Sequence, residues 1–113
     1  MIHQMRLATE YFEKIKEGVK TIECRLYDEK RKGLKVGDAI EFGDAQNEQN
    51  KVVSEIVALH QFPSFSELLD QFPIVQFGGE NKEQMLVALK KFYSDENEKK
   101  YGVVGIEIKS IKK

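Results

Sequence analysis

Polar and apolar side chains alternate in several short segments of the chain, and this period of two is the feature that most limits its possible folds. The clearest case is residues 20–27, where Ile22, Cys24 and Leu26 fall on one side of an extended backbone. Such alternation predicts a strand with one buried face. The same reasoning predicts strands over residues 2–7, 39–43, 51–62 and 101–111.

Three other segments carry apolar residues at the spacing of a helix. They cover residues 9–17, 64–72 and 81–93, and Thr9 and Ser64 are suited to cap the first two. Charged residues dominate segment 95–100, which is predicted to be a weakly ordered bridge. Strands joined by tight turns, with helices inserted between them, favour an α+β fold built on a small β-barrel over a doubly wound sheet.

The chain length predicts one domain, 1–113, large enough to bury its own core. Hydrophobic residues make up 41% of the chain and charged residues 33%, a mix typical of globular rather than disordered proteins. No apolar run suits a membrane span or a signal peptide. The lone Cys24 rules out an internal disulfide framework and fits a reducing compartment, so we expect a cytoplasmic protein.

Histidine and cysteine, the usual ligands of zinc, are scarce. His3, His60 and Cys24 show none of the spacings of zinc sites, and no glycine-rich motif of the phosphate-binding kind is present. We therefore expect neither a metal nor a cofactor. Cys24 lies on the apolar side of its predicted strand and is interpreted as a buried structural cysteine.

Charged residues are concentrated between residues 14 and 38. Eight basic and five acidic residues give this segment a charge of +3, whereas the whole chain carries −1. The near-neutral total argues against strong nonspecific binding of nucleic acid, but an anionic partner is expected to meet this segment. A solvent-exposed ladder of charges is the alternative interpretation.

Individual side chains in this segment suit a polar ligand. Lys20, Glu23 and Arg25 lie near the start of one predicted strand. Arg25 and Arg31 offer planar guanidinium groups that match phosphate, carboxylate or base edges, and Tyr27 offers a ring on which a base stacks.

The same residues carry a resemblance to a known family. The pattern Gly18-x-Lys20-Thr21-x-Glu23-x-Arg25, followed by Leu34-Lys35-Val36-Gly37-Asp38 and by the closing stretch 101–108, resembles the ASCH domain of the PUA-like superfamily. The resemblance spans nearly the whole chain. It implies a β-barrel flanked by helices, a cleft lined by the Lys20–Arg25 strand, and interaction with RNA. The ligand-binding residues so expected are Lys20, Thr21, Glu23, Arg25, Tyr27 and Arg31.

One branch of small ASCH-like proteins removes the acetyl group of N4-acetylcytidine. Resemblance to that branch implies a catalytic role for Lys20 and, at a looser spacing, for Glu80, whereas Glu23 stands where the branch has a threonine. A carboxylate at that position is expected to pair with Lys20 and keep it protonated.

The leading hypothesis is therefore recognition of RNA or a nucleoside-like ligand by a monomer or weak dimer. An amidohydrolase using Lys20, Glu23 and Glu80 is the alternative, and a protein interaction module is the second alternative.

Overall fold

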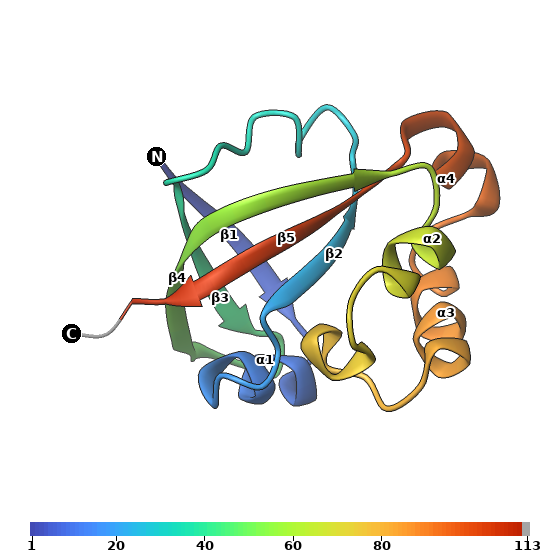
Figure 1. Cartoon of the computed structure of the whole chain (residues 1–113). Helices are drawn as coiled ribbons and strands as arrows, with labels where there is room; N and C mark the ends of the chain where they lie inside the picture. The colour runs from blue at the N-terminus through green and yellow to red at the C-terminus, as the bar shows by residue number, and fades with distance from the viewer. Residues whose placement is uncertain (112–113) are drawn as a thin grey trace.

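The computed structural model describes residues 1–111, so the last two positions of the predicted domain lie outside the described residues. It contains five strands, four α-helices and one 3-10 helix (Figure 1). The strands are β1 Ile2–Leu7, β2 Ile22–Leu26, β3 Ala39–Asp44, β4 Asn47–Phe62 and β5 Val103–Ser110. The helices are α1 Thr9–Lys16, α2 Phe65–Asp70, η1 Ile74–Phe77, α3 Lys82–Lys90 and α4 Asp95–Tyr101.

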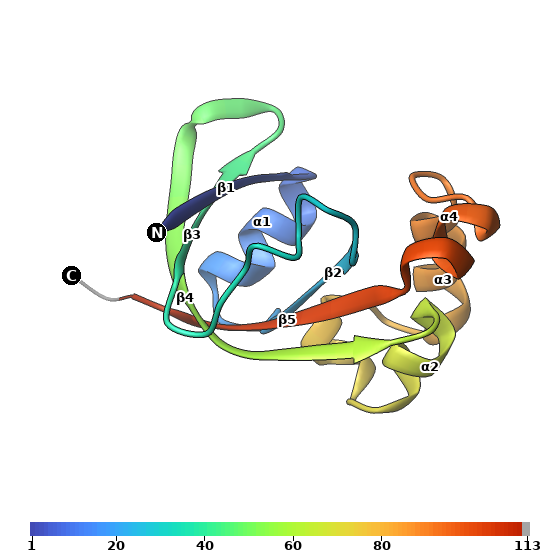
Figure 2. The same cartoon turned by 90° about the horizontal axis from the view of Figure 1, so that it is seen from above.

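The strands form one mixed sheet in the order β1-β3-β4-β5-β2. β1 runs parallel to β3, and the other neighbouring pairs are antiparallel. The sheet curls into a half-barrel, with α1 at its concave side and α2, α3 and α4 gathered beyond β2 (Figures 1 and 2). The predicted α+β fold with flanking helices is confirmed, and the predicted small barrel is present as a half-barrel. β1 and β2 are the two edge strands.

Two apolar clusters hold these layers together. One lies inside the curved sheet around Phe12, Ile40 and Phe42. The other joins the apolar side of β2 to the helices, where Ile22 meets Phe65 and residues of the same cluster. Since β2 buries alternate residues in the second cluster, Glu23 and Arg25 are directed to its other side, toward the edge of β1.

The prediction for residues 95–100 is wrong, because this segment forms α4. The Ser94 side chain accepts a hydrogen bond from the Asn97 N–H and caps the helix. Acidic residues occupy its first turn and lysines its last, which suits the helix dipole. The Glu98 carboxylate also accepts a hydrogen bond from the Phe65 N–H at 2.7 Å and so ties α4 to α2.

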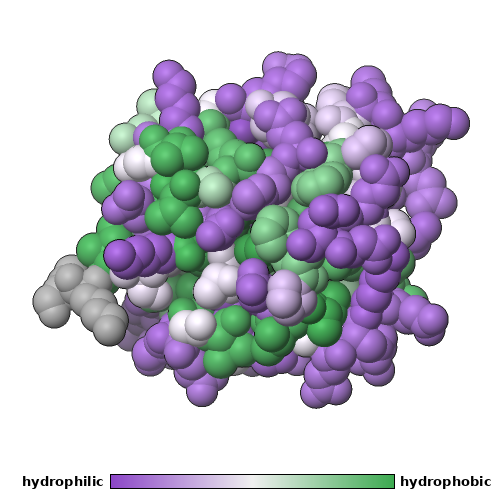
Figure 3. Space-filling view, in the orientation of Figure 1, coloured by the Kyte–Doolittle hydropathy of each residue, from purple (hydrophilic) through white to green (hydrophobic). Residues whose placement is uncertain are grey.

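Other element ends also differ from the predictions. The residue before α1 that occupies the cap position is Ala8, and Thr9 instead donates its hydroxyl to Asp44 at 2.6 Å. β4 begins at Asn47, so the polar turn after β3 is tighter than predicted. No helix within residues 1–111 is long and apolar enough to cross a membrane. On the face seen in Figure 3, hydrophilic side chains dominate the right-hand side, where Figure 1 places α3 and α4, and apolar patches lie at the upper left and along the bottom.

Candidate ligand-binding site

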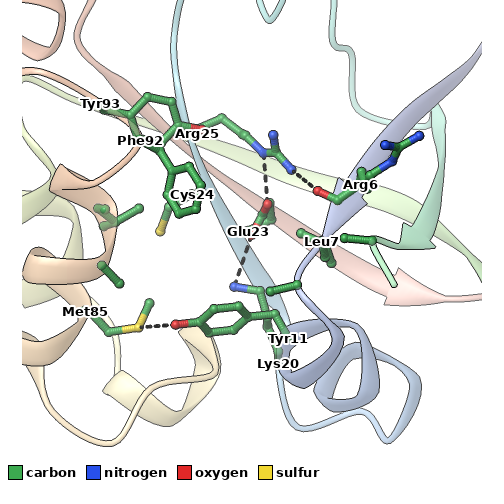
Figure 4. A pocket seen from close by; sticks show the side chains of 14 residues that line it. Arg6, Leu7, Tyr11, Lys20, Glu23, Cys24, Arg25, Met85, Phe92 and Tyr93 are labelled. Atoms are coloured by element: carbon green, nitrogen blue, oxygen red, sulfur yellow. Dashed lines mark hydrogen bonds and ion pairs between the residues drawn. The ribbon is translucent and has the colours of Figure 1, made fainter. Parts of the chain in front are cut away.

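A pocket of about 350 Å³ opens at the edge of β2, between the end of β1, helix α1 and helix α3 (Figure 4). We call it the central pocket. One wall consists of Leu7, Ala8 and Tyr11, and the opposite wall of Met85, Leu89 and Phe92. Glu23, with Lys20 on one side and Arg25 on the other, lies near the centre of the view in Figure 4. The pocket thus combines apolar walls with one group of buried charges.

Lys20 is the most deeply buried of these charges, with 2% of its side chain exposed. Its Nζ donates to the carbonyl oxygens of Phe77 at 2.7 Å and Ile22 at 2.9 Å, and lies 3.2 Å from Glu23 Oε1. The Tyr11 ring centroid is 5.3 Å from the same nitrogen. An ammonium has three N–H groups, so Lys20 has an acceptor for each of them. Lys20 therefore holds Glu23 in position.

A glycine makes this burial possible. Gly78 adopts a left-handed conformation with φ +84°, and a Cβ there would come within 3.0 Å of the Lys20 side chain. The Gly78 carbonyl accepts a hydrogen bond from Lys14 Nζ at 2.8 Å, which ties the loop to α1. The glycine at position 78 thus lets the loop after η1 lie against Lys20.

Glu23 pairs with two of the three cationic residues that line the pocket, Lys20 and Arg25. Its Oε1 faces Lys20, and its Oε2 accepts a hydrogen bond from Arg25 Nε at 2.9 Å. Burial by itself raises the pKa of Glu23, but the charges and hydrogen bonds of Lys20 and Arg25 outweigh burial and lower it from its ordinary value of 4.5. Glu23 is therefore an ionised acceptor with lone pairs to spare for a ligand.

Arg25 connects the two edge strands of the half-barrel. Its Nη2 donates to the Arg6 carbonyl of β1 at 3.2 Å, while its Nε is held by Glu23 on β2. The Tyr93 hydroxyl lies beside the guanidinium. Burial acts to lower the pKa of Arg25, yet the neighbouring Glu23 carboxylate raises it overall. Arg25 thus remains charged and spans the gap between β1 and β2.

An exposed aromatic side chain stands at the rim of the pocket. Phe92 lines the central pocket but keeps 80% of its surface exposed. The predicted helix over residues 81–93 placed Phe92 in its apolar stripe, but α3 ends at Lys90, so Phe92 lies beyond the helix and outside the buried stripe. Phe92 and Tyr93 belong to the site and were missed. Phe92 follows Leu89 at helical spacing, so the sequence contains no signal that separates Phe92 from the buried stripe.

Cys24 is buried, as predicted, with 5% of its surface exposed. It contacts the second apolar cluster and also borders the central pocket. Burial raises the pKa of its thiol to about 12, so the thiolate is disfavoured. Cys24 is consequently a structural residue and a poor nucleophile.

The other predicted site residues lie outside the central pocket. The Thr21 backbone bonds to Gln76 and Ile108, and its side chain lines a separate hollow. Tyr27 packs against the cluster inside the sheet, and Glu80 is exposed. Arg31 borders a second hollow next to Arg25. The structure therefore brings Lys20, Glu23 and Arg25 together. It leaves Thr21, Tyr27 and Glu80 outside this group, whereas Arg31 lies in a neighbouring hollow that Arg25 also lines.

Metal ligands do not gather in the described part of the chain. Within residues 1–111, no three His, Cys, Asp or Glu side chains are close enough to hold a metal ion.

Comparison with known proteins places this fold in a family. A sequence model of the ASCH domain matches residues 5–112. The crystal structure of the hypothetical protein PH0355 is 42% identical, with a TM-score of 0.87, and the match covers 98% of this chain and 100% of that one. The solution structure of protein PF0455 from Pyrococcus furiosus is 36% identical, with a TM-score of 0.79, and both chains are covered completely.

A more distant structure shares the fold alone. The ASCH protein from Zymomonas mobilis is 14% identical, with a TM-score of 0.67, and the match covers 96% of this chain and 66% of that one. No match to the chain exists among curated proteins. The family match over nearly the whole sequence, together with the curled sheet and its flanking helices, shows that the chain belongs to the ASCH domain family.

Proposed function

We propose that this protein binds RNA or a nucleoside-like molecule by taking one base into the central pocket. The observation that carries the proposal is the Glu23 carboxylate, buried between two apolar walls and held by Lys20 and Arg25. Placing an ionised group in such a site costs desolvation free energy, which a purely structural role does not require. A hydrogen-bond donor on a ligand that pairs with Glu23 explains why this charged group is buried in the pocket.

The walls of the pocket suit a flat ring. Tyr11 and Phe92 provide aromatic surface from opposite sides, and Met85 provides a polarisable thioether that accepts from the Tyr11 hydroxyl at 3.7 Å. Bases bind proteins by stacking on such side chains while their edges form hydrogen bonds. The volume of about 350 Å³ lies at the lower end of the range for small-ligand sites, which fits one base rather than several.

Glu23 favours bases that carry an exocyclic amino group. An ionised carboxylate only accepts hydrogen bonds, and cytosine, adenine and guanine present amino donors on their pairing edges. Uracil offers a carbonyl in the position where cytosine has its amino group, and two facing acceptors repel. We therefore expect cytidine and adenosine to bind more tightly than uridine.

Titration with nucleosides, followed by amide chemical shifts, tests the proposal. We expect cytidine or adenosine to shift the signals of Glu23, Arg25 and Phe92 most. Phe92→Ser should weaken binding about 5- to 150-fold, since stacking contributes about 1–3 kcal/mol per base.

The control is Val87→Ser, which changes an exposed apolar residue within α3 that does not line the pocket. It should bind like the wild type. Shifts gathered far from the central pocket, or unchanged binding in Phe92→Ser, would refute the assignment.

The hydrolase alternative finds less support in the geometry. Among the pocket-lining residues within 1–111, the only hydroxyl groups are the phenols of Tyr11 and Tyr93. Lys20 donates to three acceptors, and burial raises the pKa of the Cys24 thiol. Hydrolysis of an amide requires a positioned nucleophile or activated water and a free base beside it. These contacts favour binding without turnover.

Incubation with N4-acetylcytidine separates the two functions. We expect the protein to release no cytidine above the uncatalysed background, as followed by chromatography. A sample hydrolysed by alkali calibrates the detection of cytidine. Turnover by the wild type that disappears in Lys20→Ala would instead establish the amidohydrolase function.

A further inference from the structure

A second hollow, of about 460 Å³, adjoins the central pocket and shares Arg6 and Arg25 with it. We call it the basic hollow. It lies where β1 and β3 meet the turn that follows β2. Its lining includes five cationic side chains, which are Arg6, Arg25, Lys30, Arg31 and Lys51. It also includes the carboxylates of Glu41, Asp44 and Glu48. The ion pairs among these groups therefore determine whether the hollow attracts an anion or a cation.

Each carboxylate of the basic hollow already has a partner. Glu48 pairs with Arg6 at 3.3 Å, and Glu41 pairs with Lys51 at 3.3 Å. Asp44 accepts hydrogen bonds from the Thr9 hydroxyl and the Gln46 N–H. These contacts leave no carboxylate of the hollow for the remaining two cations.

Lys30 and Arg31 are those two cations. Among residues 1–111, neither forms an ion pair, and the Arg31 side chain has no hydrogen-bond acceptor. Arg31 is only half-exposed, and its backbone N–H bonds to the carbonyl and carboxylate of Asp28, which fixes the turn that carries it. Burial and the neighbouring Arg25 charge lower the pKa of Arg31. Two guanidinium groups thus share one end of the hollow with a surplus of positive charge.

From this juxtaposition we propose that the basic hollow is a phosphate subsite, so that the ligand of the central pocket is a nucleotide unit rather than a free nucleoside. Guanidinium groups bind phosphate oxygens with paired, charge-assisted hydrogen bonds. Arg25 contacts both hollows, so a base beside Glu23 and a phosphate beside Arg31 lie on the two sides of one side chain. The inference rests on the proposed function and narrows its ligand class.

Calorimetric titration with matched ligands tests it. The probes are cytidine and adenosine, their 5′- and 3′-monophosphates, and the dinucleoside monophosphates CpC and ApA. We expect a phosphate to raise affinity about 10-fold over the parent nucleoside, which corresponds to about 1.4 kcal/mol. In Arg31→Gln the ratio of nucleotide affinity to nucleoside affinity should fall to about one. In Lys30→Gln the same ratio should fall by a smaller factor. Lys109→Gln removes an exposed cation outside both hollows and should leave the ratio unchanged.

The results distinguish failure of the inference from failure of the proposed function. If CpC or ApA gains as much affinity over the parent nucleoside as the monophosphates do, the subsite binds an internal phosphate of a strand. If only the monophosphates gain affinity, the subsite binds the phosphate of a free nucleotide. Nucleosides that bind without any gain from phosphate, or a gain that survives in Arg31→Gln, would overturn the phosphate subsite alone. If neither nucleosides nor nucleotides bind, the proposed function falls and the subsite falls with it.

Discussion

Replacing Lys20 with methionine is expected to lower the free energy of unfolding by about 3–5 kcal/mol, the usual cost of breaking a buried ion pair from one side. Methionine has a similar length but donates no hydrogen bond. The change leaves the carbonyls of Ile22 and Phe77 without their donor and leaves Glu23 with one cation in place of two. Urea unfolding followed by circular dichroism measures the loss.

Two further variants identify which contacts cause the loss of stability in Lys20→Met. Lys16→Met removes an exposed lysine at the end of α1 and should change the free energy of unfolding by no more than about 0.5 kcal/mol. Adding Glu23→Gln to Lys20→Met should recover part of the loss, because the buried negative charge is then gone. A loss below about 1 kcal/mol in Lys20→Met would show that Lys20 does not anchor the pocket.

In the second prediction, Glu23→Gln weakens the binding of cytidine and adenosine about 10- to 150-fold, since a hydrogen bond to a charged group contributes about 1.5–3 kcal/mol. Glutamine has the same shape but carries an NH₂ group in place of one oxygen. Lys20 and Arg25 approach from two sides as donors, so that NH₂ group must face one of them or the ligand amino group. In each of these orientations two N–H groups face each other, so one hydrogen bond is lost and the groups repel.

The same nucleoside titration measures this effect, at a temperature where circular dichroism shows the variant folded. Glu13→Gln, an exposed carboxylate on α1, is the matched control and should leave affinity unchanged. Wild-type affinity in Glu23→Gln would remove Glu23 from the binding site and with it the basis of the proposed base preference.

Local patterns determined most of the architecture. The period of two in residues 20–27 correctly predicted that Ile22, Cys24 and Leu26 share a buried face of β2, because alternation leaves only one apolar side to cover. The same pattern, with the ASCH resemblance, predicted a cleft by this strand and the pairing of Glu23 with Lys20. These residues are close in sequence, so their relative positions follow from the geometry of the turn and strand that carry them.

Contacts distant in sequence were decided by the tertiary structure alone. Phe92 reaches the pocket only because α3 ends at Lys90 and packs opposite α1, and the periodicity of α3 contains no information about which element it faces. The acceptors of Lys20 at Phe77 and of Arg25 at Arg6 are backbone carbonyls, which every residue type possesses. A sequence therefore indicates which side chains require partners, whereas the packing of whole elements determines which backbone atoms and which helix supply them.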